Sequence, residues 1–525
     1  MNKRDIIIIG AGHNGLVAAY YLAKAGMKPL VLERREVLGG VCVTEVFHPG
    51  FRCSTLATSA GSFLPQLIDD LQLVHHGLQF IIPPIRVFAL NHNGPPICIY
   101  ETVKDTVSEL SLHSKPDSEK FFEFLSCFDR LGRALRPLLT MTPPNISAPT
   151  KSELWNLGKL GWKIRGLGKN DEYRLLRYGP MAVADLAAEW FENETLRAVV
   201  AARGIFGAFA GPWSAGTCAP LLMQSALNGS PIAPTVFVKG GMGALTQALA
   251  QAATAAGAEI LTNSEVAGIQ IKDERVTSVV LSSGEEIETR AVVSNADPKS
   301  TFLNLVDAAV LDPGFLQKIG NYRAHGTVAM VHLALAGLPE FANSHKLNLL
   351  GRIHIGPDID YLERAFDAAK YGDFSSKPFM EVTMPALTDA SLAPSGGLVM
   401  SIHAQYTPYK LKNGDWHARR EELGDAIVNA LSEYAPNLKE LIVERKVLTP
   451  LDLEREFALT GGHIHHGEMS LDQLFAFRPL IGCAQYRTPI KGLYLCGSGT
   501  HPGGGVTGAS GLNASREVIK DAKQK

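Results

Sequence analysis

The sequence predicts an α/β protein that is built around a parallel sheet and glycine-rich loops. Three observations lead to this prediction. Residues 6–9 are a continuous apolar run, which is typical of a parallel strand covered on both faces. A Gly-x-Gly-x-x-Gly pattern follows at residues 10–15, and apolar residues with helical spacing follow that pattern. Finally, 22 of the 50 glycines lie in residues 1–50, 240–243 and 461–511, so the demand for glycine comes from particular loops.

Composition favours a folded protein with a large core and excludes several classes of function. Of 525 residues, 46% are hydrophobic and 19% are charged, and the formal net charge is −2. A nearly neutral chain lacks the basic surface that binds DNA or RNA, so we expect no nucleic acid as a partner. The seven cysteines have no Cys-x-x-Cys spacing, which argues against a disulfide framework and a cysteine zinc site. We find no membrane-spanning apolar run and no targeting leader, and we expect a cytoplasmic location.

The first glycine-rich loop has the order of elements that a dinucleotide site requires. The predicted helix behind it ends near Gly26, and a second strand at 29–32 is followed by Glu33. In such a unit the glycines permit a tight turn, close approach of a pyrophosphate and close packing of helix and strand. The helix N-terminus offers N–H groups to phosphates, and the acidic residue binds ribose hydroxyls. The dinucleotide-binding residues predicted from this unit are Gly10, Ala11, Gly12, His13, Asn14, Gly15, Glu33 and Arg34.

Two further motifs distinguish FAD from NAD as the dinucleotide. Gly39-Gly40-Val41-Cys42-Val43-Thr44 follows Glu33, and the apolar strand 493–496 leads into a glycine-rich segment at 497–508. With these motifs the chain resembles the superfamily of phytoene desaturases and flavin amine oxidases. The resemblance implies a Rossmann-like FAD-binding domain of the glutathione reductase type, with FAD bound non-covalently. It also implies cofactor contacts at Gly39, Gly40, Val41, Val266, Asn295, Gly497, Gly505, Val506 and Thr507.

The chain departs from this family pattern at three positions. Many members carry Arg in place of Val41, an acidic residue in place of Cys53 and Asp in place of Ser498, which argues against a typical amine oxidase. Within the superfamily the chain resembles the branch called pyridine nucleotide-disulphide oxidoreductase domain-containing protein 2, on residues 461–473 and Arg478-Pro479. The paired redox cysteines of a disulfide reductase are missing. Eukaryotic members of that branch are mitochondrial, so the mitochondrial matrix is an alternative location.

The motifs divide the chain into two interleaved domains. Residues 1–80, 225–300 and 470–525 are predicted to form the FAD-binding domain. Residues 81–224 and 301–469 are then insertions that form an α+β substrate domain. No second Gly-x-Gly-x-x-Gly pattern follows a strand, so we expect no separate nicotinamide domain.

The expected reaction is hydride transfer between flavin N5 and an apolar, isoprenoid- or lipid-like substrate, in a direction that the sequence leaves open. His501, in the second glycine-rich segment, is the candidate catalytic residue; the alternative is a loop histidine that bonds backbone groups. Two other functions stay open. One is a flavin amine oxidase, and the other is a regulatory or interaction protein that retains FAD as a structural cofactor.

Two other groups of residues suggest ligands. His463, His465, His466 and Glu468 are of the types that bind metals, but the glycines around them favour a loop, and we expect no metal. Residues 151–169 interleave tryptophans with lysines and arginine. Such a stretch either lies on a membrane surface or packs on the substrate domain with its charges in water. The sequence therefore predicts an apolar small-molecule partner and, as a further hypothesis, peripheral membrane contact.

Overall fold

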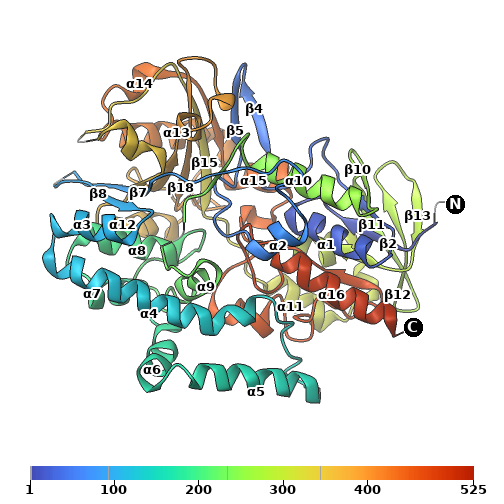
Figure 1. Ribbon diagram of the computed structural model, residues 1–525. Coiled ribbons are helices and arrows are strands. Elements are labelled where there is room, and N and C mark those ends of the chain that lie inside the picture. Colours follow the sequence, from blue (N-terminus) through green and yellow to red (C-terminus); the bar gives the residue numbers. More distant parts are fainter. Residues whose placement is uncertain (1–2, 93, 233, 343, 525) are drawn as a thin grey trace.

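A five-stranded parallel sheet lies at the right of Figure 1, close to both termini. The computed structural model describes residues 3–92, 94–232, 234–342 and 344–524. Neighbouring strands of this sheet are parallel throughout, which confirms the predicted α/β class. In spatial order the strands are β10 (Glu259–Leu261), β3 (Pro29–Leu32), β2 (Ile6–Ile9), β14 (Val292–Ser294) and β20 (Leu493–Leu495).

Both faces of this sheet are covered, which explains why its strands are continuous apolar runs. Ile6 and Ile8 pack on a helical layer, whereas Ile7 and Ile9 pack on a second sheet. The helices are α1 (His13–Lys24), α10 (Met242–Ala255) and α16 (Ala509–Lys523). The second sheet consists, in order, of β1 (Lys3–Arg4), β13 (Glu286–Thr289), β12 (Arg275–Leu281) and β11 (Val266–Lys272).

A seven-stranded mixed sheet forms the upper left part of the molecule in Figure 1. Within it, β16 and β7 are parallel and the other neighbours are antiparallel. Helix α13 (Trp416–Ser432) covers one of its faces. In spatial order the strands are β19 (Ile442–Leu448), β15 (Val328–Leu335), β18 (Leu398–Gln405), β17 (Phe379–Thr383), β16 (Arg352–Ile355), β7 (Ile85–Leu90) and β8 (Ile97–Tyr100).

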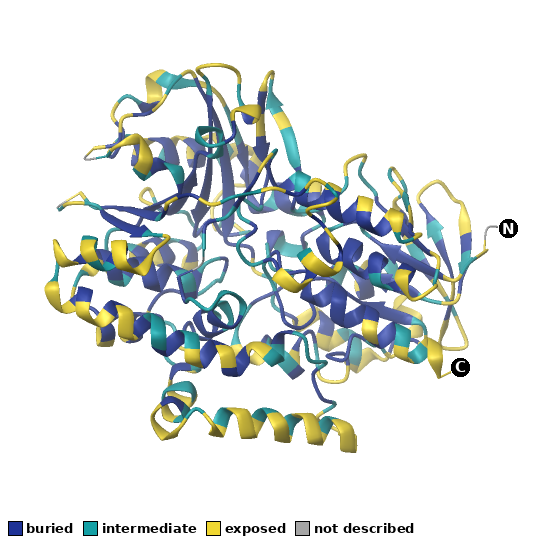
Figure 2. Ribbon diagram, viewed as in Figure 1, coloured by how far each residue is buried: buried dark blue, intermediate teal, exposed yellow. Residues whose placement is uncertain are grey.

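A helical region lies beside this sheet and has its own core, in which Phe124 and Phe128 are fully buried. One helix of the region, α5, has no buried residue and extends along the lower edge of the molecule (Figures 1 and 2). The helices are α3 (Val103–Ser111), α4 (Lys115–Leu139), α5 (Lys151–Arg165), α6 (Lys169–Tyr178), α7 (Val183–Trp190), α8 (Glu194–Ile205), α9 (Ala219–Asn228) and α12 (Ile359–Lys370).

Smaller elements connect these layers. Among the residues that the structure describes, no helix is both long and apolar enough to cross a bilayer. The remaining helices and strands are α2 (Pro65–Asp70), α11 (Pro313–Asn321), α14 (Leu438–Leu441), α15 (Pro450–Phe457), β4 (Thr44–His48), β5 (Phe51–Ser54), β6 (Phe80–Ile81) and β9 (Phe237–Val238). Short 3₁₀ or π segments lie at Ser300–Leu305, Ala308–Val310, Lys346–Leu350, Pro385–Leu387, Ala390–Leu392, Thr460–Gly462, Leu471–Gln473 and Phe475–Phe477.

Candidate cofactor and active site

The first glycine-rich loop joins β2 to α1 and leaves the N-terminus of α1 free of side-chain caps. Gly12 is the N-cap residue, no side chain caps the helix, and its first turn holds no acidic residue. The N–H groups of this turn are therefore available to phosphate oxygens. The neighbouring strand holds the loop, because the Gly10 N–H donates to the Leu32 carbonyl at 2.8 Å.

Two positions in this loop have no room for a side chain. A Cβ atom on Gly15 would lie 2.2 Å from the Gly10 carbonyl oxygen, and one on Gly12 would lie 2.8 Å from Asn295 Nδ2. Gly10 itself has a φ of +92°, in the region that favours glycine. A larger residue at position 15 would push α1 away from the sheet, and with it the helix N-terminus.

Glu33 lies directly after β3, where the sequence predicts a ribose-binding carboxylate. Its Oε2 accepts a hydrogen bond from the Ala11 N–H at 2.8 Å, and its Oε1 accepts one from the Arg35 N–H at 3.0 Å. These bonds fix the orientation of the carboxylate. Each oxygen keeps a further lone pair, so the group can still accept hydrogen bonds from sugar hydroxyls.

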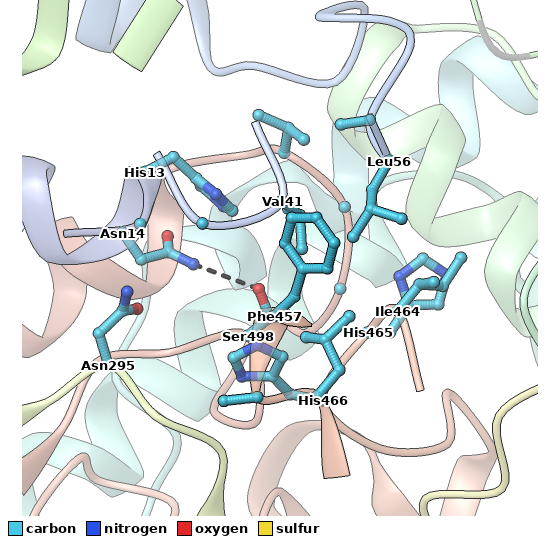
Figure 3. A pocket seen from close by; sticks show the side chains of 18 of the residues that line it. His13, Asn14, Val41, Leu56, Asn295, Phe457, Ile464, His465, His466 and Ser498 are labelled. Atoms are coloured by element: carbon cyan, nitrogen blue, oxygen red, sulfur yellow. Dashed lines mark hydrogen bonds between the residues drawn. The ribbon is translucent and has the colours of Figure 1, made fainter. Parts of the chain in front are cut away.

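A cavity of about 550 Å³ opens beside these residues. Figure 3 shows Asn14 of α1 and Ser498 of the second glycine-rich segment, whose side chains are joined by a 3.3 Å hydrogen bond, with His466 and Phe457 beside them. The two glycine-rich segments therefore meet at one wall of the cavity. Most of the predicted cofactor residues line it, namely Gly10, Gly12, His13, Asn14, Glu33, Arg34, Gly40, Val41, Val266, Asn295, Gly505 and Val506.

The other predicted cofactor residues support this wall without lining the cavity. The Gly39 N–H donates to the Ala11 carbonyl at 3.0 Å, and a Cβ atom on Gly497 would lie 2.6 Å from the Asn295 carbonyl oxygen. Thr507 Oγ1 accepts a hydrogen bond from the first N–H of α16 at 3.2 Å. The residues in this supporting group are Ala11, Gly15, Gly39, Gly497 and Thr507.

Several residues that line the cavity were missed by the sequence predictions. His465 fills a slot between two glycines, because a Cβ atom on Gly207 would lie 2.7 Å from its Nε2 and one on Gly504 would lie 2.3 Å from its Cβ. The run of histidines was a signal for this residue, although we expected only a loop there. The apolar members of the set carry no local signal; they are Leu56, Ala57, Phe206, Met330, Phe457, Ile464 and Met469.

Three histidines that line the cavity keep a buried ring nitrogen without a hydrogen-bond partner: His13 Nε2, His465 Nδ1 and His466 Nδ1. Burial, with a smaller effect of His466, lowers the pKa of His13 to about 4. Burial, with His463 beside it, lowers the pKa of His465 to about 3. Orphaned buried polar atoms are uncommon in a native fold. Together with the uncapped N-terminus of α1 and the Glu33 carboxylate, these atoms fit a bound dinucleotide.

The candidate catalytic residue, His501, does not line the cavity, which differs from the sequence-based expectation. Its side chain is buried, and its Nε2 lies 2.6 Å from the Leu138 carbonyl oxygen of α4. Burial lowers its pKa to about 4, so the imidazole is neutral and its N–H donates to that carbonyl. Its ring also packs edge-to-face on Phe475. These contacts favour the structural alternative, in which His501 ties the second glycine-rich segment to α4.

The histidines of segment 461–473 do not converge on one point. His463 Nε2 lies 3.3 Å from Glu468 Oε1, whereas His465 and His466 line the cavity. Within the described ranges, no group of three or more His, Cys, Asp or Glu residues is arranged to hold a metal ion. Glu468 also accepts hydrogen bonds from the N–H groups of Phe209 and His325. The segment is thus tied to its neighbours through Glu468.

Arg478 is a fully buried cation behind the same wall. Its guanidinium donates to five backbone carbonyls, at distances between 2.7 and 3.4 Å. Burial lowers its pKa, but the carbonyl dipoles solvate the charge. The side chain joins the histidine-rich segment to the second glycine-rich segment, because the accepting carbonyls belong to His465, Gly467, Glu468, Gln473 and Ser498.

Known relatives cover almost the whole chain. It is 37% identical, over 99% of its length and 94% of the relative, to pyridine nucleotide-disulfide oxidoreductase domain-containing protein 2 of Rattus norvegicus. It is 27% identical, over 98% of its length and 94% of the relative, to a polypeptide of the limonene dehydrogenase of Castellaniella defragrans.

The fold has relatives among solved structures as well. A putrescine oxidase variant superimposes with a TM-score of 0.62 at 15% identity, covering 99% of both chains. Residues 15–519 match the family described as flavin-containing amine oxidoreductase. This match agrees with the resemblance found in the sequence, and it identifies the dinucleotide for which the cavity is built as FAD. The chain therefore belongs to the flavin-containing amine oxidoreductase family and is an FAD-dependent oxidoreductase.

Proposed function

We propose that the protein transfers a hydride between an apolar, isoprenoid- or lipid-like substrate and FAD. The observation that carries this proposal is the lining of the cavity beyond the glycine-rich segments, where aliphatic and aromatic side chains dominate. Removing apolar surface from water stabilises a complex by about 25 cal/mol per Å², so such a wall favours an apolar substrate. The residues concerned are Leu56, Phe206, Met223, Leu227, Met330 and Ile464.

FAD supplies the hydride-accepting N5 atom when it is bound, and the chain supplies binding and exclusion of water. His332 of β15 and His403 of β18 have Nε2 atoms 3.0 and 2.8 Å from the carbonyl oxygens of Thr55 and Leu56. Burial lowers the pKa of His332 to about 3 and that of His403 to about 4, so both rings are neutral donors. They hold the segment after β5 against the sheet, which fixes Leu56 in the cavity wall.

The relatives support an apolar substrate class and keep one alternative open. The relative from Castellaniella defragrans is named after limonene, a hydrocarbon, whereas the family description and the putrescine oxidase fold favour an amine. The chain differs from the typical amine oxidase pattern at Val41, Cys53 and Ser498. The third candidate is a regulatory protein that keeps FAD as a structural element.

Anaerobic titration of the FAD-loaded protein separates these functions. We expect limonene or a longer isoprenoid to bleach the visible flavin absorbance, and putrescine to leave it unchanged. Bleaching by putrescine alone would contradict the proposal and favour an amine oxidase. Tightly bound FAD that none of these compounds reduces would favour the regulatory protein.

We also propose that α5 contacts the surface of an anionic membrane. Trp155 and Trp162 lie seven residues apart on this helix and are 67% and 83% exposed. Lysines at positions 151, 159 and 163 accompany them, a pattern that suits the interface of anionic lipids. Figure 2 shows the helix exposed along most of its length.

Sedimentation with vesicles containing phosphatidylserine at low salt tests this contact. We expect the unaltered protein to sediment with them, and the double variant Trp155→Ala, Trp162→Ala to stay in the supernatant with its FAD. Tyr371→Ala is the matched control, because Tyr371 is 69% exposed on another part of the surface. Equal sedimentation of all three proteins would exclude the proposed role of α5.

A further inference from the structure

The seven-stranded sheet is polar on the face that lines the cavity, which is unusual for the interior of a substrate domain. Strand alternation sends Val331, Ile402, Val382 and Ile353 to the face covered by α13. The residues between them form two rows across β15, β18, β17 and β16. Reading across the four strands, these rows are His332, Ser401, Thr383 and Arg352, and then Met330, His403, Glu381 and His354.

Two arginines and one glutamate meet in these rows. Arg203 of α8 donates from its guanidinium to Glu381 Oε1, and Arg352 Nε lies 3.2 Å from the same oxygen. The side chains of Arg203, Glu381 and Arg352 are 7%, 6% and 9% exposed. All three line the cavity. One carboxylate thus faces two guanidiniums, and the cluster carries one uncompensated positive charge.

The hydrogen-bonding capacity of this cluster is also unfilled. The Nε atoms of Arg203 and Arg352 are buried without a hydrogen-bond partner, and so is Thr383 Oγ1. Burial, with Arg352 beside it, lowers the pKa of Arg203 well below its ordinary value. A buried charge without a partner is strongly unfavourable, and a buried donor without an acceptor adds to the cost. The cluster therefore lacks one anionic acceptor.

The surroundings place this cluster at the substrate side of the cavity. Arg203 and Arg352 share the cavity wall with Phe206, Met330 and Leu56. The arginines nearer the cofactor loops have partners of their own: Arg35 pairs with Glu45 at 2.5 Å, and Arg34 donates to two backbone carbonyls.

We propose that Arg203 and Arg352 bind the carboxylate of an amphipathic substrate whose apolar part fills the rest of the cavity. The proposal rests on the proposed function, since it specifies the substrate class of the same site. A monoanion balances the single excess charge, and a planar carboxylate matches the fork of a guanidinium. The same excess charge repels an ammonium group, which disfavours an amine in this cavity.

The first test compares compounds with the same apolar chain on the unaltered, FAD-loaded protein. Dodecanoate, its methyl ester, dodecylamine and dodecyl phosphate are titrated by calorimetry. We expect dodecanoate to bind at least about tenfold more tightly than the ester and the amine. Equal affinity for acid and ester would overturn the proposal. Tighter binding of dodecyl phosphate than of dodecanoate would overturn the assignment to a carboxylate.

The second test uses variants of the cluster. Arg352→Gln should weaken dodecanoate binding by about tenfold or more and leave the affinity for the ester unchanged. Arg364→Gln is the matched control, since Arg364 is 70% exposed and should change neither affinity. If Arg352→Gln does not fold, Arg203→Lys provides the same comparison, with a smaller loss for the acid alone. An acid affinity that neither variant lowers would contradict the assignment.

Binding is measured without flavin reduction, so the two proposals can fail separately. If dodecanoate binds through Arg352 but no amphipathic acid reduces FAD, the anion site stands and the proposed hydride transfer is contradicted. If apolar compounds reduce FAD but acids bind no better than esters, the reverse holds.

Discussion

His501 has its only described side-chain hydrogen bond with a backbone carbonyl, that of Leu138. We therefore expect His501→Ala to retain FAD and to keep the rate of flavin reduction by an active substrate within about twofold. The free energy of unfolding should fall by about 1–3 kcal/mol, because a buried carbonyl loses its donor. Stopped-flow reduction and urea unfolding measure the two quantities.

His75→Ala serves as the control for this variant, because the His75 side chain is exposed and makes a ring contact with His76 alone among the described residues. A loss of more than about tenfold in the reduction rate of His501→Ala, with FAD intact, would restore the catalytic role.

Arg478 gives a second prediction at this scale. Arg478→Met removes the donor for five buried carbonyls, and each unsatisfied group costs about 1–3 kcal/mol. We expect the variant to lose FAD on gel filtration and to unfold at a much lower urea concentration. Arg478→Lys should be intermediate, since an ammonium group keeps the charge but reaches fewer acceptors. Full FAD retention by the Met variant would contradict this account.

At the scale of elements, the crossing of α1 and α16 sets the distance between the two glycine-rich segments. A Cβ atom on Gly511 of α16 would lie 2.1 Å from the Asn14 carbonyl oxygen of α1. Backbone atoms cannot yield as a flexible side chain can, so the helices would separate. Asn14 also bonds Ser498 across the same junction, and this bond would lengthen.

Gly511→Ala is therefore expected to destabilise the protein by about 1–3 kcal/mol and to weaken FAD binding, because overpacking outweighs the helix propensity of alanine. Gly320→Ala in α11 is the matched control: no atom lies within 4 Å of its Cβ position, and it should gain up to about 1 kcal/mol. Urea unfolding of both variants, with FAD fluorescence as the readout of release, checks the pair. Equal stabilities would refute the close-approach argument.

The start of α10 shows how tertiary contacts move an element. The small-residue pattern predicts a helix from Thr246, but α10 begins at Met242. Its first N–H groups donate to Ser54 Oγ and Thr44 Oγ1, at 3.0 and 2.9 Å. These caps come from β4 and β5, about 190 residues away along the chain, so no local pattern could reveal them.

At the scale of the whole molecule, the buried histidines predict how stability depends on pH. An unfolded histidine titrates near 6.5, whereas these titrate lower because burial disfavours their charged form. Between about pH 6.5 and about pH 4 the unfolded chain therefore binds protons that the folded chain does not, and the free energy of unfolding falls as the pH falls. The residues, with a pKa of about 3 or about 4, are His13, His332, His354, His403, His465 and His501.

Each of these histidines contributes up to about 1.4 kcal/mol per pH unit in that window, and none contributes above it. Urea unfolding of the FAD-loaded protein at a series of pH values measures the slope. Replacing His354 by Asn should reduce the slope by the share of one proton. Stability that stays constant from about pH 7 to about pH 5 would be inconsistent with neutral buried histidines.

The sequence by itself determined the parallel sheet, the glycine-rich loops and most of the FAD-contacting wall. The reason is physical: a strand, a turn at Gly10 and a helix N-terminus are neighbours along the chain, and glycine is required there by backbone geometry. The same local reasoning misplaced His501, because a loop histidine has the same pattern whether it faces a cavity or a carbonyl of α4.

The tertiary structure alone decided the substrate side of the cavity. Arg203 and Glu381 are 178 residues apart, and each is a lone charge inside an otherwise apolar or small-residue element, with no periodic signal. Strand register brings Arg352 beside them, and burial turns three ordinary surface residue types into a cluster with one excess charge. Local sequence encodes which backbone a cofactor can approach, whereas the pairing of distant strands decides which charges share a cavity.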